Sequence, residues 1–377
     1  MNKVLLGDVA EEVRDNYKET DGNPAVVGLE HLIPGEIRLK EWSEDTNTTF
    51  TKAFHKGQVL FGRRRAYLKK AAVAPVDGIC SGDITVISAK PDKILPELLP
   101  FVIQNDDFFD FAVGKSAGSL SPRVKWSRLK EYEFNLPSLP QQKELAKLLW
   151  SFVNAKEAYE DLIRQTDELV KSQFIEMFGY PGRVDKGYTI KPLGDICTVE
   201  RGGSPRPISD YVTDDPNGLN WIKIGDADTD RYITHTVEKI RPEGLSKTRQ
   251  VHAGDLLLSN SMSFGRPYIL KIDGCIHDGW LVLHFDDTVM DAIYLQTFLS
   301  LPETFSAFEK MAEGAVVNNL NSTVVKKLPL LVPTKEEQLY YREFVDQSDK
   351  SKFELQYVNR NVKEMITCSQ KKIRLNR

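Results

Sequence analysis

Basic side chains concentrate in two windows of the chain that contain no acidic residue. Residues 51–70 hold seven lysines and arginines, and residues 114–130 hold five more, with Tyr67 and Trp126 between them. Such a surface attracts phosphates, and an arginine can also bind a guanine edge in the major groove. A solvated charge run is the alternative, but we favour DNA contact. The expected DNA-binding residues here are Arg63, Arg64, Arg65, Lys69, Lys70, Arg123, Lys125 and Arg128.

The second half of the chain offers a weaker set of the same kind. Its asparagines and serines lie in glycine-flanked loops, and an asparagine amide suits an adenine edge. Asparagine and serine are equally common as simple turn formers, so both interpretations stay open. The candidates are Arg201, Arg206, Asn260, Ser261, Ser263, Arg266, Asn318, Asn319 and Asn321.

Residue sets typical of DNA-cutting or DNA-modifying enzymes are missing from the sequence. No aspartate or glutamate is followed two residues later by lysine, and neither an NPPY-like loop nor a glycine-rich cofactor loop occurs. The six histidines show no HxxxH or HExxH spacing, and Cys275 with His277 lacks a partner ligand pair. We therefore expect no catalytic residue, no metal ligand and no cofactor in this chain.

Composition indicates a globular protein of the cytoplasm. The chain has 377 residues, 41% of them hydrophobic and 28% charged, with a formal net charge of −4. Its four cysteines show no CxxC spacing, which is typical of a reducing compartment. The first residues, MNKVLLGDVAEEV, do not resemble a signal peptide, and no apolar run is long enough to cross a bilayer.

The sequence contains an internal repeat. HKGQVLFG from His55 recurs as HAGDLLLS from His252, and the Leu-Gly-Asp at Leu6 recurs at Leu193. A longer segment, residues 118–137, recurs as residues 314–333 at an offset of 196. Ahead of the last part of each repeat, short apolar runs are bounded by Gly, Pro and Asp, as is typical of β-strands. Each copy is therefore expected to form an α+β domain. About nine extra residues in the second copy are expected in loops.

Each repeat ends in a long predicted helix. Ser138 with Gln141, and Thr334 with Glu337, fit capping boxes. Apolar residues then recur in matching heptads, which favours a coiled coil between the two helices over two amphipathic helices that each cover their own domain. The predicted boundaries are 1–137, 138–180, 181–333 and 334–377. The expected coiled-coil and partner contacts are Leu145, Leu148, Phe152, Tyr159, Leu162, Leu169, Tyr341, Phe344, Leu355, Val358, Val362 and Met365.

Several ordered segments resemble the specificity (S) subunits of Type I restriction-modification systems. They are LPSLPQQKELAKLL and LLVPTKEEQLYYREF at the helix starts, and VLFGRRRAYLKKAAVAPVDGICSGD and DLLLSNSMSFGRPYILKIDGCIHDGW inside the domains. RGGSPRPISDY followed by GLNWIKIGD resembles the opening of a target-recognition domain. The first copy departs there, because RDNYKETDGNPAVVGLEHL lacks the Gly-Gly-Ser-Pro element.

The resemblance implies two target-recognition domains at opposite ends of two antiparallel coiled-coil helices. Each would read one half of a split site in double-stranded DNA. Methyltransferase subunits carrying S-adenosylmethionine, and restriction subunits that use ATP and Mg²⁺, would bind to this scaffold. Two other hypotheses remain: a stand-alone DNA-modifying enzyme, and a coiled-coil adaptor that binds only proteins.

Overall fold

The computed structural model describes residues 2–17, 24–118, 120–183, 186–228, 230–260, 264–312 and 320–373. It divides into two compact units, each described here by itself. Unit 1 comprises Met1–Asp161 and Leu355–Arg377, and unit 2 comprises Leu162–Glu354. Each unit therefore combines one globular head with part of each long helix. This division differs from the predicted boundaries, which placed the helices in segments of their own.

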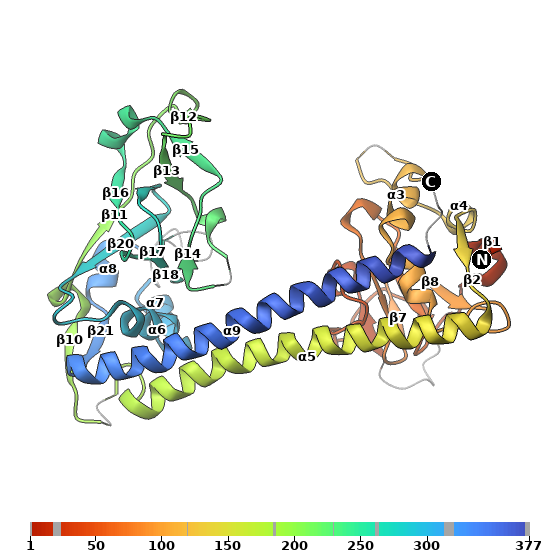
Figure 1. The fold of residues 1–377 in the computed structure, drawn as a ribbon, viewed down its shortest axis with the longest axis horizontal. Helices are drawn as coiled ribbons and strands as arrows, with labels where there is room; N and C mark the ends of the chain where they lie inside the picture. The colour runs from red at the N-terminus through yellow and green to blue at the C-terminus, as the bar shows by residue number, and fades with distance from the viewer. Residues whose placement is uncertain are drawn as a thin grey trace. The chain divides into compact units, whose positions relative to one another are not determined.

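The head of unit 1 is built from short strands and short helices (Figure 1). Antiparallel strands form a sheet in the order β2-β8-β5-β6, a second sheet has the order β3-β7-β4 with β3 parallel to β7, and β1 pairs with β9. The elements are β1 (Asn2–Leu5), α1 (Leu6–Val9), β2 (Ala10–Val13), β3 (Ala25–Val27), β4 (Lys52–Phe54), β5 (Val59–Gly62), β6 (Ala71–Val73), β7 (Gly78–Cys80), β8 (Ile84–Ala89), α2 (Leu99–Ile103), α3 (Asp106–Gly114), α4 (Trp126–Leu129), β9 (Glu133–Leu136) and the long helix α5 (Leu139–Phe178).

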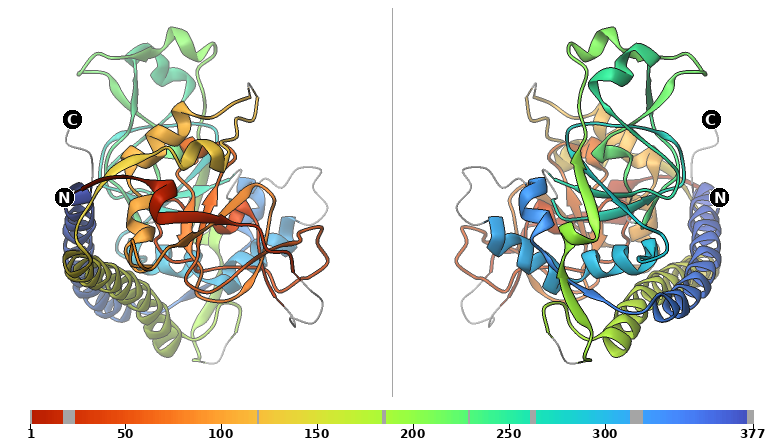
Figure 2. Two further views of the ribbon diagram at one scale, coloured as in Figure 1. Left: turned by 90° about the vertical axis from the view of Figure 1, so that its right-hand side faces the viewer. Right: turned by 90° about the vertical axis from the view of Figure 1, so that its left-hand side faces the viewer.

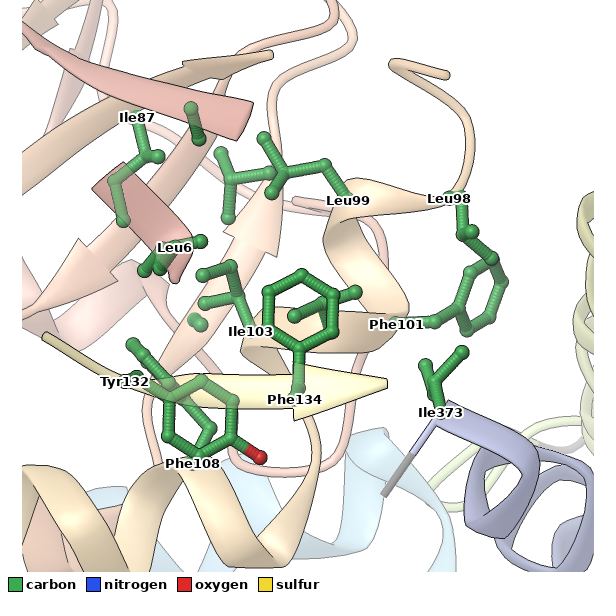
Figure 3. Packing of buried hydrophobic residues seen from close by; sticks show 14 of the residues in the cluster. Leu6, Ile87, Leu98, Leu99, Phe101, Ile103, Phe108, Tyr132, Phe134 and Ile373 are labelled. Atoms are coloured by element: carbon green, nitrogen blue, oxygen red, sulfur yellow. The ribbon is translucent and has the colours of Figure 1, made fainter. Parts of the chain in front are cut away.

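The main core of unit 1 lies between the β2-β8-β5-β6 sheet, the helices α2 and α3, and the first half of α5. Aromatic rings fill it, and Phe61 meets Phe108 edge to face with centroids 5.4 Å apart. Figure 3 shows that Phe101 and Phe134 lie in the same cluster as Ile373, which ends the short 3-10 helix Lys371–Ile373 after the last long helix of the chain. The C-terminal segment thereby closes the core of the N-terminal head.

Unit 2 repeats this architecture and extends it. Its sheets have the orders β11-β20-β17-β18-β14, β12-β15-β13-β19-β16 and β10-β21. The elements are β10 (Thr189–Pro192), β11 (Cys197–Arg201), β12 (Val212–Thr213), β13 (Leu219–Ile222), β14 (Tyr232–Ile233), β15 (Glu238–Ile240), β16 (Arg249–Val251), β17 (Leu256–Ser259), β18 (Pro267–Leu270), β19 (Gly274–Ile276), β20 (Trp280–Phe285), α6 (Ala292–Ser300), α7 (Pro302–Ala312), α8 (Ser322–Lys326), β21 (Pro329–Val332) and the long helix α9 (Lys335–Gln370).

The sequence repeat is also a repeat of strand register. Val59 pairs with Ile87 between β5 and β8, and Leu256 pairs with Leu283 between β17 and β20. The parallel pair β3–β7 corresponds to β13–β19. The strands β12 and β15 have no counterpart among the described strands of unit 1, and Figures 1 and 2 show this green extension at the end of unit 2 farthest from the unit's own helix segments. The extra residues of the second copy thus include a hairpin-like extension as well as loops.

The predicted capping box at Thr334 is confirmed in both directions, and at Ser138 the half of the box that the Gln141 side chain makes is present. The Ser138 backbone N–H and hydroxyl donate to Gln141 Oε1 at 3.2 and 3.1 Å. The Thr334 backbone N–H donates to Glu337 Oε2 at 2.9 Å, and the Glu337 N–H donates back to Thr334 Oγ1 at 3.3 Å. These bonds satisfy donors that a helix start leaves without partners.

Within each unit the α5 and α9 segments pack antiparallel. Tyr341 donates a hydrogen bond to the carbonyl oxygen of Val170 in unit 2, and Lys363 lies 3.3 Å from Glu160 in unit 1. In unit 2, Lys352 also contacts Asp167, so the residue number falls along α5 as it rises along α9. This arrangement confirms the antiparallel pair that the family resemblance implied.

The predicted heptad positions are wrong for part of the seam. The side chains of Leu148, Leu162, Leu169, Val358 and Met365 are exposed, by between 36% and 53%. At Leu148 and Leu169 the following residue, Leu149 or Val170, is buried instead and packs in the hydrophobic core of its head. Adjacent apolar residues let the heptad pattern fit equally well one position away. The residues buried along the two helices include Leu145, Leu149, Val153, Lys156, Val170, Phe174, Tyr341, Val345, Lys352, Asn359 and Val362. Phe152, Tyr159, Phe344 and Leu355 are half-buried.

A buried glutamine at the start of each long helix attaches it to its head. Gln142 donates to the carbonyl oxygens of Lys93 and Pro137 at 3.1 and 3.0 Å and accepts from the N–H of Leu95 at 2.9 Å. Gln338 makes the same three bonds, to the carbonyl oxygens of Val289 and Pro333 and the N–H of Asp291. These contacts explain the proline-then-glutamine motif, since an amide is the side chain that both donates and accepts.

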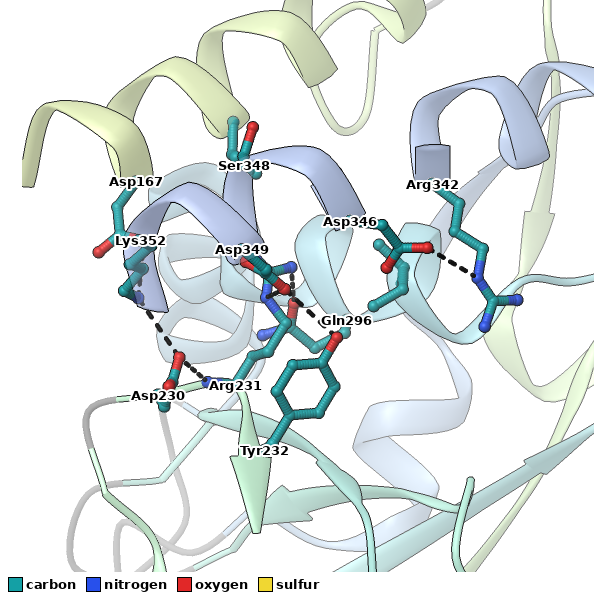
Figure 4. Close-up of polar contacts among 12 residues, drawn as sticks. Asp167, Asp230, Arg231, Tyr232, Gln296, Arg342, Asp346, Ser348, Asp349 and Lys352 are labelled. Carbon is teal, nitrogen blue, oxygen red and sulfur yellow. Dashed lines mark hydrogen bonds and ion pairs between the residues drawn. The ribbon is translucent and has the colours of Figure 1, made fainter. Parts of the chain in front are cut away.

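A buried lysine forms a second attachment, farther toward the C-terminal end of each long helix. Lys156 donates to Glu36 at 2.6 Å and lies 3.4 Å from Glu160. Its repeat equivalent, Lys352, donates to Asp167 at 3.0 Å and to Asp230 at 3.3 Å, as Figure 4 shows. Glu36 and Asp230 both lie just before the chain that runs parallel to β6 or to β18. Each head therefore provides a carboxylate at the same place for a lysine of a long helix.

We predict that Lys156→Met destabilises unit 1 and that adding Glu36→Gln restores most of the loss. Burial raises the pKa of Glu36, but the hydrogen bonds from Lys156 and Lys40 outweigh this effect and hold it below its ordinary value. Removing the lysine leaves a half-buried carboxylate with one cation fewer, which costs about 2–4 kcal/mol of unfolding free energy. Urea unfolding measures this cost, with the exposed Lys143→Ala as a control near zero.

The pH dependence of this prediction has a definite sign. A carboxyl with a lowered folded-state pKa contributes stability above its unfolded pKa and loses that contribution as the pH falls through the folded value. The difference in unfolding free energy between wild type and Lys156→Met should therefore become smaller as the pH falls. A double variant that is no more stable than Lys156→Met would contradict the ion-pair account.

Candidate nucleic-acid interface

The two basic windows of unit 1 meet in space. The chain leaves β5 at Gly62, and Arg64 forms an isolated antiparallel bridge with Arg123. The Arg65 N–H donates to the Pro122 carbonyl oxygen at 2.8 Å, on the same stretch of chain. The chain segments that carry Arg63, Arg64 and Arg65 on one side and Arg123 on the other therefore lie side by side, although the Nε of Arg63 is buried.

An aspartate from a third segment lies among these arginines. Asp83, in the turn between β7 and β8, accepts from Arg123 Nε at 2.7 Å and Nη2 at 3.1 Å. Arg64 Nη1 lies 3.4 Å from the same carboxylate. The hydrogen bond from Arg123 holds the pKa of Asp83 below its ordinary value, so this carboxylate is charged at neutral pH. The windows lack acids in sequence but not in the folded protein.

The remaining basic residues of unit 1 divide into exposed and paired side chains. Arg65 and Lys125 are exposed, and their side chains contact no partner among the described residues. Lys69 pairs with Asp106 at 2.7 Å, and Arg128 lies 3.5 Å from Glu131. Lys70 donates to the carbonyl oxygen of Leu29 at 2.7 Å. These three are held by groups away from Asp83 and have less freedom to move to a phosphate.

The backbone after β5 is strained. Arg65 and Lys69 have φ of 54° and 51°, in the left-handed region that non-glycine residues seldom adopt. Between them, the side chain of Tyr67 is 54% exposed. Strain held at an exposed arginine-rich turn is typical of a binding site.

The second unit places an aspartate at the corresponding turn, between β19 and β20. The Asp278 carboxylate accepts from Ser204 Oγ at 2.7 Å and lies 3.9 Å from Arg206 Nη2. Arg201 Nε donates to its backbone carbonyl oxygen at 2.9 Å. The bond from Ser204 is the main cause that lowers the pKa of Asp278. Arg201 and Arg206 are thus brought together around Asp278.

One asparagine expected to contact DNA, Asn260, is buried, which corrects that prediction, whereas Asn321 is exposed and its expected DNA contact stays a prediction. Asn260 is 2% exposed and donates to the Asp278 carbonyl oxygen at 3.0 Å. Asn321 caps α8 by accepting from the Val324 N–H at 2.9 Å. Arg266 lines a cavity of about 360 Å³ with Lys352 and Gln296 rather than the Asp278 turn. Ser261, Ser263, Asn318 and Asn319 lie outside the described residues.

Sequence reasoning missed Asp83, Ser204 and the role of Asp278. Neither aspartate lies in a basic window, so a pattern of positive charge alone does not identify it. The internal repeat could have indicated both aspartates, because an aspartate follows the equivalent strands β7 and β19 in both copies.

Metal and thiol chemistry find little support in the part of the chain that the structure describes. No group of three histidine, cysteine, aspartate or glutamate side chains there is close enough to hold a metal ion. Burial raises the pKa of Cys80 and Cys197 to about 12 and that of Cys275 to about 11, which disfavours the nucleophilic thiolate form. Cys368 is exposed. Within the same residues no helix is long and apolar enough to span a membrane.

Comparisons with known proteins agree with the repeat. The family model of the Type I restriction modification DNA specificity domain matches residues 3–165 and 185–363. The Type I restriction enzyme EcoDI specificity subunit of Escherichia coli is 29% identical over 127 residues, and the MjaIX specificity subunit of Methanocaldococcus jannaschii is 33% identical over 168. These alignments cover 31% and 41% of this chain, but only 28% and 38% of the two relatives.

Solved structures show the same fold at low sequence identity. A chain from a study of complex assembly and conformational transition of the type I R-M system superimposes with a TM-score of 0.57 at 21% identity, covering 98% of this chain and 96% of that one. The Type I restriction-modification S subunit of M. genitalium gives 0.56 at 12% identity, covering 100% and 96%. Because the family model matches most of both repeats, this chain belongs to the Type I restriction modification DNA specificity domain family.

Proposed function

We propose that this chain is the DNA-reading subunit of a Type I restriction-modification complex, with each unit binding one half of a bipartite site. The observation that carries this proposal is the pairing of a family match with an arginine-rich turn in each unit, at Asp83 and at Asp278. Guanidinium groups supply both phosphate contacts, which position a protein on DNA, and base contacts, which specify a sequence.

The chemistry of the complex would reside in partner subunits. Methyltransferase subunits would carry S-adenosylmethionine, and restriction subunits would use ATP and Mg²⁺, all in the cytoplasm. The long helices also expose large apolar side chains, and such side chains are suited to contacts with partner subunits. They are Leu148, Leu162, Leu169, Val358 and Met365. The chain itself would act by recognition alone.

The chain alone should not methylate or cleave DNA, but it should direct adenine methylation to one site when a methyltransferase partner is added. The test incubates the pure chain, the partner and both together with labelled S-adenosylmethionine and a library of duplexes. Label incorporated by the chain without its partner would support the stand-alone enzyme instead. The proposal would also be contradicted if the methyltransferase partner methylated the same sequence without this chain.

Arg65→Ala and Lys125→Ala should each weaken binding to all DNA sequences by a similar factor. Both side chains are exposed, and an exposed cation that contacts a phosphate releases about one counterion. The slope of log affinity against log salt should therefore fall by about one for each variant. Lys143→Ala, on an exposed position of α5, is the control and should leave the slope unchanged. Unchanged affinity in both variants would place this turn away from the DNA.

A further inference from the structure

The ion pair between Asp83 and Arg123 leaves one edge of the guanidinium available. Asp83 accepts from Nε and Nη2, which is the side edge of the planar group. The remaining N–H groups, on Nη1 and the outer side of Nη2, have no protein acceptor among the described residues. The Arg123 side chain is 43% exposed and that of Asp83 only 19%. The arginine thus presents a free end while its carboxylate partner is recessed.

The carboxylate is itself held rigidly. The Asp83 N–H donates to Ser81 Oγ at 3.2 Å, and its carbonyl oxygen accepts from the Arg63 N–H at 2.9 Å. Arg64, the other cation at this carboxylate, is also tied to Ser121 Oγ through its Nε at 2.6 Å. Arg123 therefore projects from a fixed base, and little side-chain entropy remains to be lost when it binds.

A fixed guanidinium end matches one partner in DNA particularly well. Two parallel N–H groups can donate to O6 and N7 of guanine in the major groove. A phosphate would also accept from them, but a negative carboxylate behind the arginine disfavours close approach of the negative backbone. The neutral base edge does not meet that repulsion.

We propose that Arg123 reads a guanine in the half-site bound by unit 1, and that Asp83 is the positioning residue that orients it. This inference rests on the proposed function and adds the base that is read. Unit 2 does not repeat the arrangement, because the Asp278 carboxylate accepts from Ser204 and Arg206 stays 3.9 Å away. The guanine contact therefore belongs to one half-site only.

The experiment uses the full chain with its methyltransferase partner and starts from the site that this complex selects from random duplexes. Each guanine of that site is replaced in turn by 7-deazaguanine, which lacks the N7 acceptor, or by another base pair. Wild type should lose affinity by roughly 5- to 140-fold at one guanine of one half-site when its base pair is changed. Arg123→Ala and Arg123→Lys should abolish discrimination there, although lysine keeps the charge and the salt slope.

Asp83→Asn tests the positioning role. It should reduce discrimination at that same guanine while affinity for unrelated DNA stays equal or rises, because a negative charge has been removed. In an Arg123→Ala background it should change discrimination no further, since the two residues act as one unit. Asp278→Asn is the matched control and should leave this guanine unaffected. Thermal unfolding of each variant separates these effects from a loss of folding.

The outcomes distinguish this inference from the function on which it rests. A complex that selects no sequence would overturn both. A complex that selects a bipartite site, but in which Arg123→Ala weakens all duplexes equally and lowers the salt slope by about one, would overturn only the inference and make Arg123 a phosphate contact. Undiminished discrimination in Asp83→Asn would remove the positioning role.

Discussion

Polar groups buried between a head and a long helix are the constraint on which the rest of the structure depends. Gln142 and Gln338 satisfy main-chain groups of their heads, and Lys156 and Lys352 meet carboxylates that the heads provide. A buried donor or charge without its partner is costly, so these contacts fix where each head sits on its helix segments. The repeat preserves both contacts at an offset of 196 residues, although much of the surrounding sequence differs.

The head supported in this way presents an arginine cluster that is not purely basic. An aspartate at the turn after β7 or β19 contacts arginines from segments far apart in the sequence. The overall charge of −4 therefore does not oppose DNA binding, because the relevant field is local. A carboxylate among cations weakens their general attraction for phosphates, but it also holds the arginines in a defined orientation. Such an orientation suits a protein that discriminates among sequences.

The sequence predicted the architecture more fully than the site. Internal repetition and helix starts are local patterns, so the two heads and the starts of the two long helices could be anticipated from motifs such as those at Ser138 and Thr334. The antiparallel pairing of the helices was implied only by the family resemblance. The buried face of the first long helix was placed one residue away at Leu148, because Leu148 and Leu149 satisfy the pattern equally and only packing against the head selects Leu149. Asp83 was missed and Asn260 misjudged for a related reason. Their roles depend on which distant segments fold against them, and no local pattern contains that information.

The central claim is that two related heads read two separate half-sites. It is tested most directly by replacing Gly187–Pro333 with the matching segment of another family member and determining the methylated site of the chimera with the same methyltransferase. The account predicts that one half-site changes to that of the donor while the other keeps its sequence. A change in both half-sites, or in neither, would contradict it.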